Sequence, residues 1–232
     1  MVREYEGVTS YQRPLIDAPV FRGIDGEVID YGNRWEGSPP EDTYSVDTHP
    51  ERFAPLHTVA LALIDHLGDT YDVALVEGDD AVADLLHPAS DVIRAVRIQP
   101  TDPACAAVTI VFTKYPGIFM HAGLLHDFHY PVCGCDACDS TWDAEADALE
   151  QQLLAVASGN YSERIDRGPR PWIEHKFTYP GQGWQGGRGR ARDISAERVK
   201  RAKPVLRNLP GGVWAAWPKA NSDSDHGREV WR

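Results

Sequence analysis

The chain of 232 residues is 42% hydrophobic and 25% charged, which is the balance of an ordinary globular domain and argues against wholesale disorder. It has no apolar run near the roughly 20 residues that cross a bilayer, and its first residues lack the order of a signal peptide, so we expect a cytoplasmic protein without membrane contact. The net charge of −12 makes nucleic acid an unlikely partner, because an acidic body repels a polyanion.

The N-terminal arm, residues 1–47, is rich in Gly, Pro, Asp and aromatic residues and shows neither helical nor strand periodicity. We expect an irregular segment that aromatic side chains anchor to the body of the protein. The four residues considered for this are Tyr11, Phe21, Tyr31 and Trp35. The alternative is a loosely packed surface arm.

A first helix is predicted at about 50–67, because apolar residues recur at three- and four-residue steps from Leu56 to Leu67. Pro50 suits its first turn. Strands are then expected at 71–76, 92–98, 106–113 and 118–121, with a short helix or turn at 79–86. The short links favour antiparallel hairpins, since parallel crossovers need a dozen or more residues.

A second helix is predicted at about 141–158, with Ser140 as its cap and Asp143 three residues later. Residues 172–178 have strand composition, and 180–190 read as a mobile Gly-rich loop. A third helix, at about 195–207, begins at Ser195. The two tryptophans of 211–218 are expected to pack back on the body, and 219–232 form a polar tail.

These elements predict a single α+β domain at 48–218, in which an antiparallel sheet made from 71–130 and 172–178 is covered by about three helices. Residues 183–207 carry 8 Lys and Arg against 2 Asp and Glu. Nucleic-acid contact through this basic segment is one hypothesis, but an exposed, solvated helix explains the same charges.

The most informative stretch is His126–Asp139, with the sequence HDFHYPVCGCDACD. It holds three of the four cysteines of the chain. Cys135 and Cys138 have the commonest spacing of zinc ligands, and Gly134 gives the backbone freedom to turn Cys133 toward them. A fourth ligand is available from His129 or His126. The stretch therefore predicts a zinc site made by Cys133, Cys135, Cys138 and one of the two histidines.

Other interpretations of the cluster remain open. The cysteines can be reduced, partly buried residues of a turn, or Cys135 and Cys138 can form a redox dithiol at the start of a helix. A metal-dependent hydrolase would use the same metal with His121, His126 or Asp127 beside an open coordination position. No nucleophile elbow, zinc-protease motif or dinucleotide fingerprint is present in the sequence.

Four stretches together resemble a family of uncharacterised bacterial proteins of actinobacterial type. They are HDFHYPVCGCDACD, HPERFAPLHTVALALIDHL, FTKYPGIFMHAG and WAAWP, and the likeness covers about 48–218. The resemblance implies a one-domain bacterial protein with a shared Cys/His site, and it brings no activity. We expect a structural zinc site in a binding or interaction module whose partner, a protein or a small molecule, the sequence does not identify.

Overall fold

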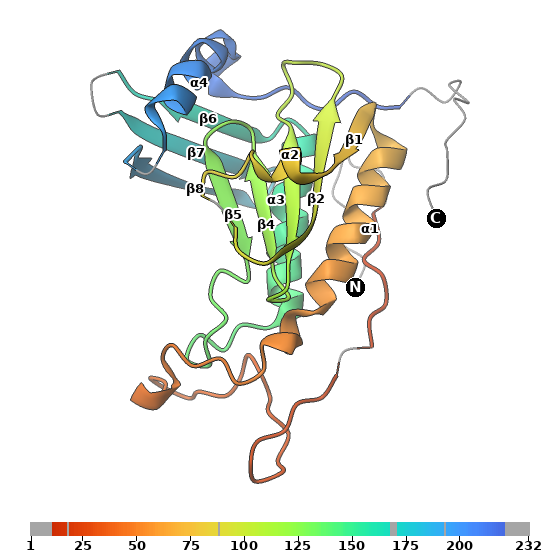
Figure 1. Ribbon diagram of the computed structural model, residues 1–232, viewed down its shortest axis with the longest axis vertical. Helices are drawn as coiled ribbons and strands as arrows, with labels where there is room; N and C mark the ends of the chain where they lie inside the picture. The colour runs from red at the N-terminus through yellow and green to blue at the C-terminus, as the bar shows by residue number, and fades with distance from the viewer. Residues whose placement is uncertain (1–10, 18, 88, 168–170, 193, 221–232) are drawn as a thin grey trace.

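A computed structural model describes residues 11–17, 19–87, 89–167, 171–192 and 194–220, so most of the predicted polar tail lies outside the described residues. Five antiparallel strands form sheet 1, in which each strand pairs with the next one in the sequence (Figure 1). In chain order they are β1 (Val73–Glu77), β2 (Val92–Pro100), β3 (Val108–Thr113), β4 (Ile118–Ala122) and β5 (His126–Tyr130). The predicted hairpin arrangement of this region is therefore confirmed.

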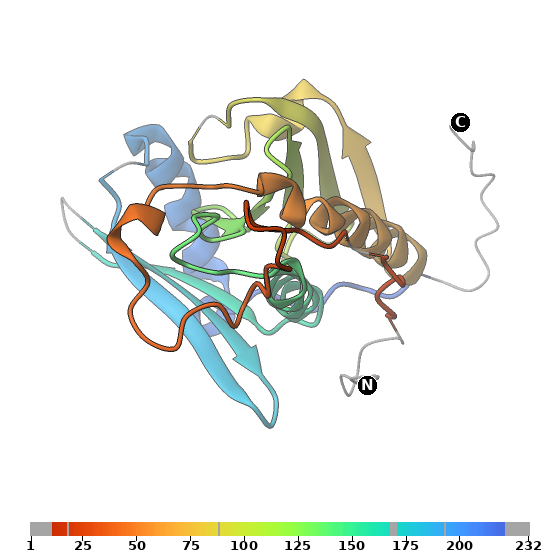
Figure 2. The ribbon, with the colours of Figure 1, turned by 90° about the horizontal axis from the view of Figure 1, so that it is seen from below.

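Two long helices lie side by side against one face of sheet 1 (Figures 1 and 2). They are α1 (Pro55–Thr70), which follows a 3-10 turn at Pro50–Phe53, and α3 (Trp142–Ala157). The apolar stripe from Leu56 to Leu67 is buried, as its spacing predicts. The cap of α3 is Thr141, whose hydroxyl accepts the Ala144 N–H, and not the predicted Ser140. The single α+β domain is as predicted.

A second sheet replaces part of the expected architecture. β6 (Tyr161–Ile165), β7 (Trp172–Tyr179) and β8 (Gly183–Arg190) form an antiparallel sheet 2, beside α3. The prediction that 172–178 joins the first sheet was wrong, as was the prediction of a loop at 180–190. Gly186 of β8 is needed because the strand passes close to β7 there: a Cβ on this residue would lie 2.5 Å from the carbonyl oxygen of His175.

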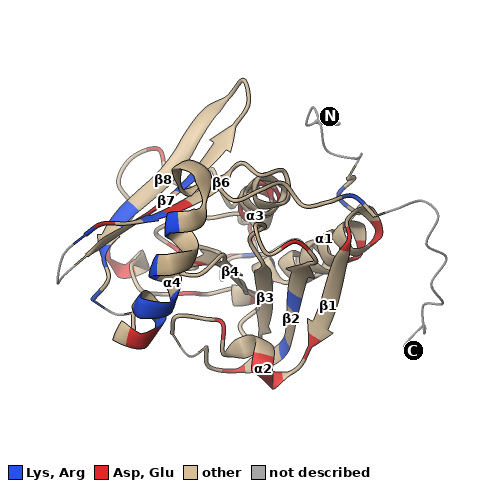
Figure 3. Ribbon diagram, turned by 90° about the horizontal axis from the view of Figure 1, so that it is seen from above, with Lys and Arg blue, Asp and Glu red and all other residues tan. Residues whose placement is uncertain are grey.

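The remaining helices complete the covering of the sheets. The short α2 (Asp79–Val82) lies over the opposite face of sheet 1, where Ala81 and Leu85 pack against Ala95 and Val111. The predicted basic helix is α4 (Ala196–Asn208), which contacts β6 and carries basic residues on its exposed side (Figure 3). Within the described ranges, no helix is long and apolar enough to span a bilayer.

The C-terminal segment 213–219 joins the two sheets. Trp214 N–H donates to the carbonyl of Tyr161 at the edge of sheet 2, and Ala215 N–H donates to Ala104, just before β3. Both tryptophans of the segment are buried, and the Trp217 indole donates to the Ala106 carbonyl at 2.8 Å. The expected return of these tryptophans to the core is confirmed.

The described part of the N-terminal arm has little regular structure, as expected, but it is bound to the body at many points. Arg13 forms a two-point contact with Glu150 of α3, with distances of 2.8 and 2.7 Å. The Tyr11 ring packs on His66 of α1, and the Trp35 indole donates to the carbonyl of Asp136. Specific polar contacts therefore hold the arm, in addition to the predicted aromatic ones.

Candidate metal centre

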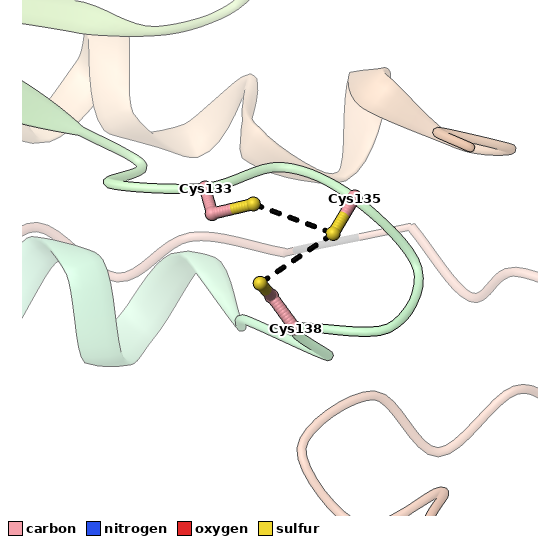
Figure 4. Close-up of side chains that lie close together, drawn as sticks. All are labelled: Cys133, Cys135 and Cys138. Carbon is pink, nitrogen blue, oxygen red and sulfur yellow. Dashed lines mark hydrogen bonds between the residues drawn. The ribbon is translucent and has the colours of Figure 1, made fainter. Parts of the chain in front are cut away.

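Three sulfur atoms converge in the cysteine loop, residues 131–140, which connects β5 to α3 (Figure 4). The Sγ atom of Cys135 lies 3.3 Å from that of Cys133 and 3.4 Å from that of Cys138. All three cysteines are free thiols, and their sulfurs lie within 4.8 Å of one another. Among the described residues this is the only group of three or more Cys, His, Asp or Glu side chains arranged to hold a metal ion.

The loop takes this shape through backbone contacts. The Cys138 N–H donates to the carbonyl of Cys135 and closes the turn between them. The N–H groups of Asp136 and Ala137 donate to the carbonyls of Val46 and Thr43 in the arm. At Gly134, a Cβ would lie 1.8 Å from the Tyr115 hydroxyl oxygen, so only glycine fits between the first two cysteines without movement of Tyr115.

Asp136 and Asp139, on either side of Cys138, bind the arm and the residue that follows it. The Asp139 carboxylate accepts the N–H groups of Gly32 and Arg34 at 2.9 Å each and pairs with the Arg34 guanidinium at 2.5 Å. The Asp136 carboxylate accepts the hydroxyl and the N–H of Thr48. Asp139 thus binds Gly32 and Arg34 of the arm, and Asp136 binds Thr48, the first residue after the arm. These contacts attach the cysteine loop to the arm and to the chain that follows it.

Arg52 is the cation at the centre of this contact and is only 3% exposed. Its guanidinium donates to the carbonyls of Gly134 and His49 at 2.5 and 2.9 Å and pairs with Asp47 at 2.9 Å. It also lies over the Tyr31 ring, 4.5 Å from the centroid. The side chain therefore ties the backbone between Cys133 and Cys135 to the start of the first helix.

The thiols of Cys135 and Cys138 differ in acidity. Hydrogen bonds from the Cys133 thiol and from the Cys138 N–H lower the pKa of Cys135 to about 7. The neighbouring sulfurs of Cys133 and Cys135 raise the pKa of Cys138 to about 12. A cation among the sulfurs favours the thiolate form of all three, because it replaces their mutual repulsion by attraction.

The two predicted histidine ligands lie elsewhere. His126 begins β5, so about 13 Å of extended strand separates it from the end at which the cysteine loop starts. Its Nδ1 lies 2.8 Å from the Glu163 carboxylate. His129 is exposed and packs edge-on against the Phe119 ring. The structure brings together the three predicted cysteines and places both histidines in other surroundings.

A buried carboxylate, Glu163 of β6, was not foreseen as an important residue. It is 0% exposed and accepts four hydrogen bonds. The donors are the N–H groups of Leu124 and Leu125, the His126 imidazole and the Trp214 indole, at 2.8 to 3.1 Å. Its place in the sequence could have indicated its burial, because alternate residues of a strand point to the same face and Glu163 shares the inward face of β6 with Tyr161 and Ile165. This residue joins sheet 1, sheet 2 and the C-terminal segment.

His175 lies beside this carboxylate, with its ring 4.6 Å from that of His126. Burial, followed by the positive charge of His126, lowers the pKa of His175 to about 4. The folded protein therefore resists protonation that the unfolded chain accepts near pH 6.5, and stability must fall as the pH drops from about 6.5 toward 4.

We expect the wild-type protein to lose about 2 kcal/mol more free energy of unfolding than His175→Gln between pH 7.5 and 4.5. Urea unfolding followed by circular dichroism at the two pH values gives this difference. Titration of groups that do not interact with His175, thiols included, affects both proteins equally and cancels. Equal losses in the two proteins would show that His175 is not held neutral by the fold.

The fold and the cluster define an α+β protein with a three-cysteine centre of the kind that can hold a metal ion. The chain belongs to the family of unknown function DUF6226, whose model matches residues 17–221. The matched region includes most of the N-terminal arm and so begins well before residue 48, where the resemblance in the sequence was expected to start. No curated protein and no solved structure matches the chain.

Proposed function

We propose that Cys133, Cys135 and Cys138 bind one zinc ion, and that this ion has a structural role in a cytoplasmic binding module. The observation that supports the proposal most directly is the spacing of the sulfurs. Zinc–sulfur bonds of about 2.3 Å in a tetrahedron place two sulfurs about 3.8 Å apart. The separations of 3.3 and 3.4 Å need only a small outward movement of the side chains to reach that value.

The surroundings of the sulfurs favour a structural role over a catalytic one. A hydrolytic zinc needs an acid or base next to its open position. Asp136 and Asp139, the carboxylates adjacent to the cysteines in sequence, are occupied by Thr48 and by Arg34 with Gly32. His121 and Asp127, considered for a hydrolase, pair with each other at 2.6 Å on β4 and β5. The fourth zinc position is left to a donor from outside the group.

Purified protein is expected to contain about one zinc per chain by elemental analysis, and each of Cys133→Ser, Cys135→Ser and Cys138→Ser should reduce that content strongly. Removal of the ion by a chelator should lower the melting temperature by about 10 °C, since a tight ligand contributes roughly 3–4 kcal/mol at high saturation. Cobalt substitution should give thiolate-to-metal charge-transfer bands.

Cys105→Ser is the matched control, because Cys105 is the one cysteine outside the cysteine loop. It is 3% exposed, and its thiol donates to the carbonyl of Ala216 in the C-terminal segment. Its zinc content should equal that of the wild type. Zinc at the same level in Cys135→Ser as in the wild type, or no response to chelator, would contradict the proposal.

A dithiol redox role is the second candidate, and the exposed sulfur of Cys138 at 3.4 Å from that of Cys135 favours it. Attack of a Cys135 thiolate on the disulfide of an oxidised partner would form a mixed disulfide, which Cys138 would resolve to leave an intramolecular disulfide and a reduced partner. Thiol counting before and after incubation with oxidised glutathione distinguishes the candidates. A reversible loss of two thiols in zinc-free protein as isolated supports the redox role.

A further inference from the structure

The outer face of sheet 2 carries aromatic and basic side chains. Residues paired across antiparallel strands point to the same side of a sheet, so the register places Arg164, Glu174 and Arg188 in one row. Ser162, Lys176 and Gly186 form the next row, and Trp184 follows on β8. Trp184 is 67% exposed, and the ammonium group of Lys176 lies 5.2 Å from the centroid of its ring.

A cavity of about 370 Å³ opens on this face. Its lining includes Arg164, Glu174, Lys176, Trp184 and Arg188. Gly186, Gly187 and His175 also line it, and Gly186, which shares the outer face with Lys176, leaves the backbone of β8 accessible there. The volume is in the range of sites that hold small organic ligands, roughly 300–1,000 Å³.

The charge of the lining is opposite to that of the chain. Three cations and one carboxylate line the cavity, in a protein whose net charge is −12. Arg188 is engaged by Glu174 and by Asp166, at 2.7 Å each. Arg164 donates two of its five N–H groups to the carbonyl of Gly211, which fixes the guanidinium and leaves further donors. Basic residues gather on the side of the molecule formed by sheet 2 and α4 (Figure 3).

We propose that this cavity binds a nucleotide, with the heteroaromatic ring stacked on Trp184 and the phosphate held by Lys176 and Arg164. An exposed indole offers a stacking surface for any base. A guanidinium and an ammonium group supply the charge-assisted donors that phosphate oxygens accept. Glu174 orients Arg188 and limits the positive charge of the cavity. The site is independent of the cysteine loop.

A free mononucleotide fits the observations better than a nucleic-acid strand. The cavity has a volume of only about 370 Å³, whereas a strand needs a basic groove several nucleotides long. The acidic remainder of the chain repels a long polyanion, but it affects one phosphate much less.

Isothermal titration of the full chain with each of the four ribonucleoside 5′-monophosphates tests the proposal. At least one should bind saturably, and the matching nucleoside and inorganic phosphate should each bind about tenfold more weakly, because each lacks one of the two contacts. Trp184→Ala and Lys176→Gln should each weaken nucleotide binding about tenfold. Both side chains are at the surface of the sheet, so we expect both variants to fold.

Lys203→Gln is the matched control for charge, because Lys203 lies on α4 outside the cavity lining. This variant should bind the nucleotide as tightly as the wild type does. Three results would overturn the proposal. They are no saturable binding of any of the four nucleotides up to about 5 mM, unchanged affinity in Trp184→Ala, and binding of a single-stranded oligonucleotide about tenfold tighter than its mononucleotide. The last result would assign the face to nucleic acid.

Discussion

Replacement of Glu163 by alanine is expected to lower the free energy of unfolding by about 3–5 kcal/mol. The substitution leaves four donors without their acceptor in a region that water does not reach, and one of them is the imidazole of His126. Burial raises the pKa of Glu163, but the hydrogen bond and charge of His126 and the Leu125 N–H outweigh it, so the net shift is downward. The carboxylate form is therefore the one that stabilises the fold.

Glu163→Gln should cost less than the alanine variant, about 2–3 kcal/mol, because the amide oxygen still accepts while its NH2 group faces donors. Glu77→Gln is the control, since Glu77 is exposed and its one recorded ion pair is with Arg94, so we expect a change of at most about 0.5 kcal/mol. Urea unfolding at pH 7.5 measures all three. A loss of less than about 1 kcal/mol in Glu163→Ala would show that this residue does not hold the sheets together.

Replacement of Arg52 by methionine is expected to lower the free energy of unfolding by about 3 kcal/mol, which is the second large effect. The apolar side chain keeps most of the volume but leaves Asp47 and the carbonyls of Gly134 and His49 without their buried donor. Because Arg52 holds the backbone between Cys133 and Cys135, the variant should also release the proposed zinc ion to a chelator faster than the wild type does.

Arg94→Met is the matched control for this variant, because Arg94 is 41% exposed at the side chain and pairs with exposed Glu77. It should change neither the stability, beyond about 0.5 kcal/mol, nor the rate of zinc release. Urea unfolding and a colorimetric chelator assay give the two readouts. If Arg52→Met released zinc at the wild-type rate, the arm and the metal centre would be energetically separate.

The sequence predicted the helices and strands that have a clear apolar periodicity or a run of β-branched residues. The apolar stripe from Leu56 to Leu67 predicted α1, and the β-branched run of β3 predicted the central strand of sheet 1. Sheet 2 was missed because its edge strands lack such patterns. β6 contains Ser162, Glu163 and Arg164, whose roles depend on partners far away in the sequence. β8 is a strand of 8 residues, GWQGGRGR, in which every second residue on average is glycine, and it pairs because β7 supplies the opposite edge.

The candidate site shows the same division. The spacing of Cys135 and Cys138 follows from a short turn, so the sequence alone predicts their approach. The histidines were chosen by nearness in sequence, but a β-strand carries His126 away from the loop and directs His129 to Phe119. The hydrogen-bond partners of Asp139 and Asp136 are Arg34 in the arm and Thr48 just after it, and no local pattern indicates these pairings.

The contacts that Arg34 and Thr48 make with the cysteine loop also affect the order of events during synthesis. Arg34 meets Asp139, and Thr48 meets Asp136, across 105 and 88 residues of chain. At roughly 5–20 residues per second, a ribosome needs about 5–20 s to make the missing partner. During that interval the arm has been made, but its acceptors have not. Completion of this corner of the molecule is therefore expected to be a late, slow phase of folding, after the hairpins of sheet 1 have formed.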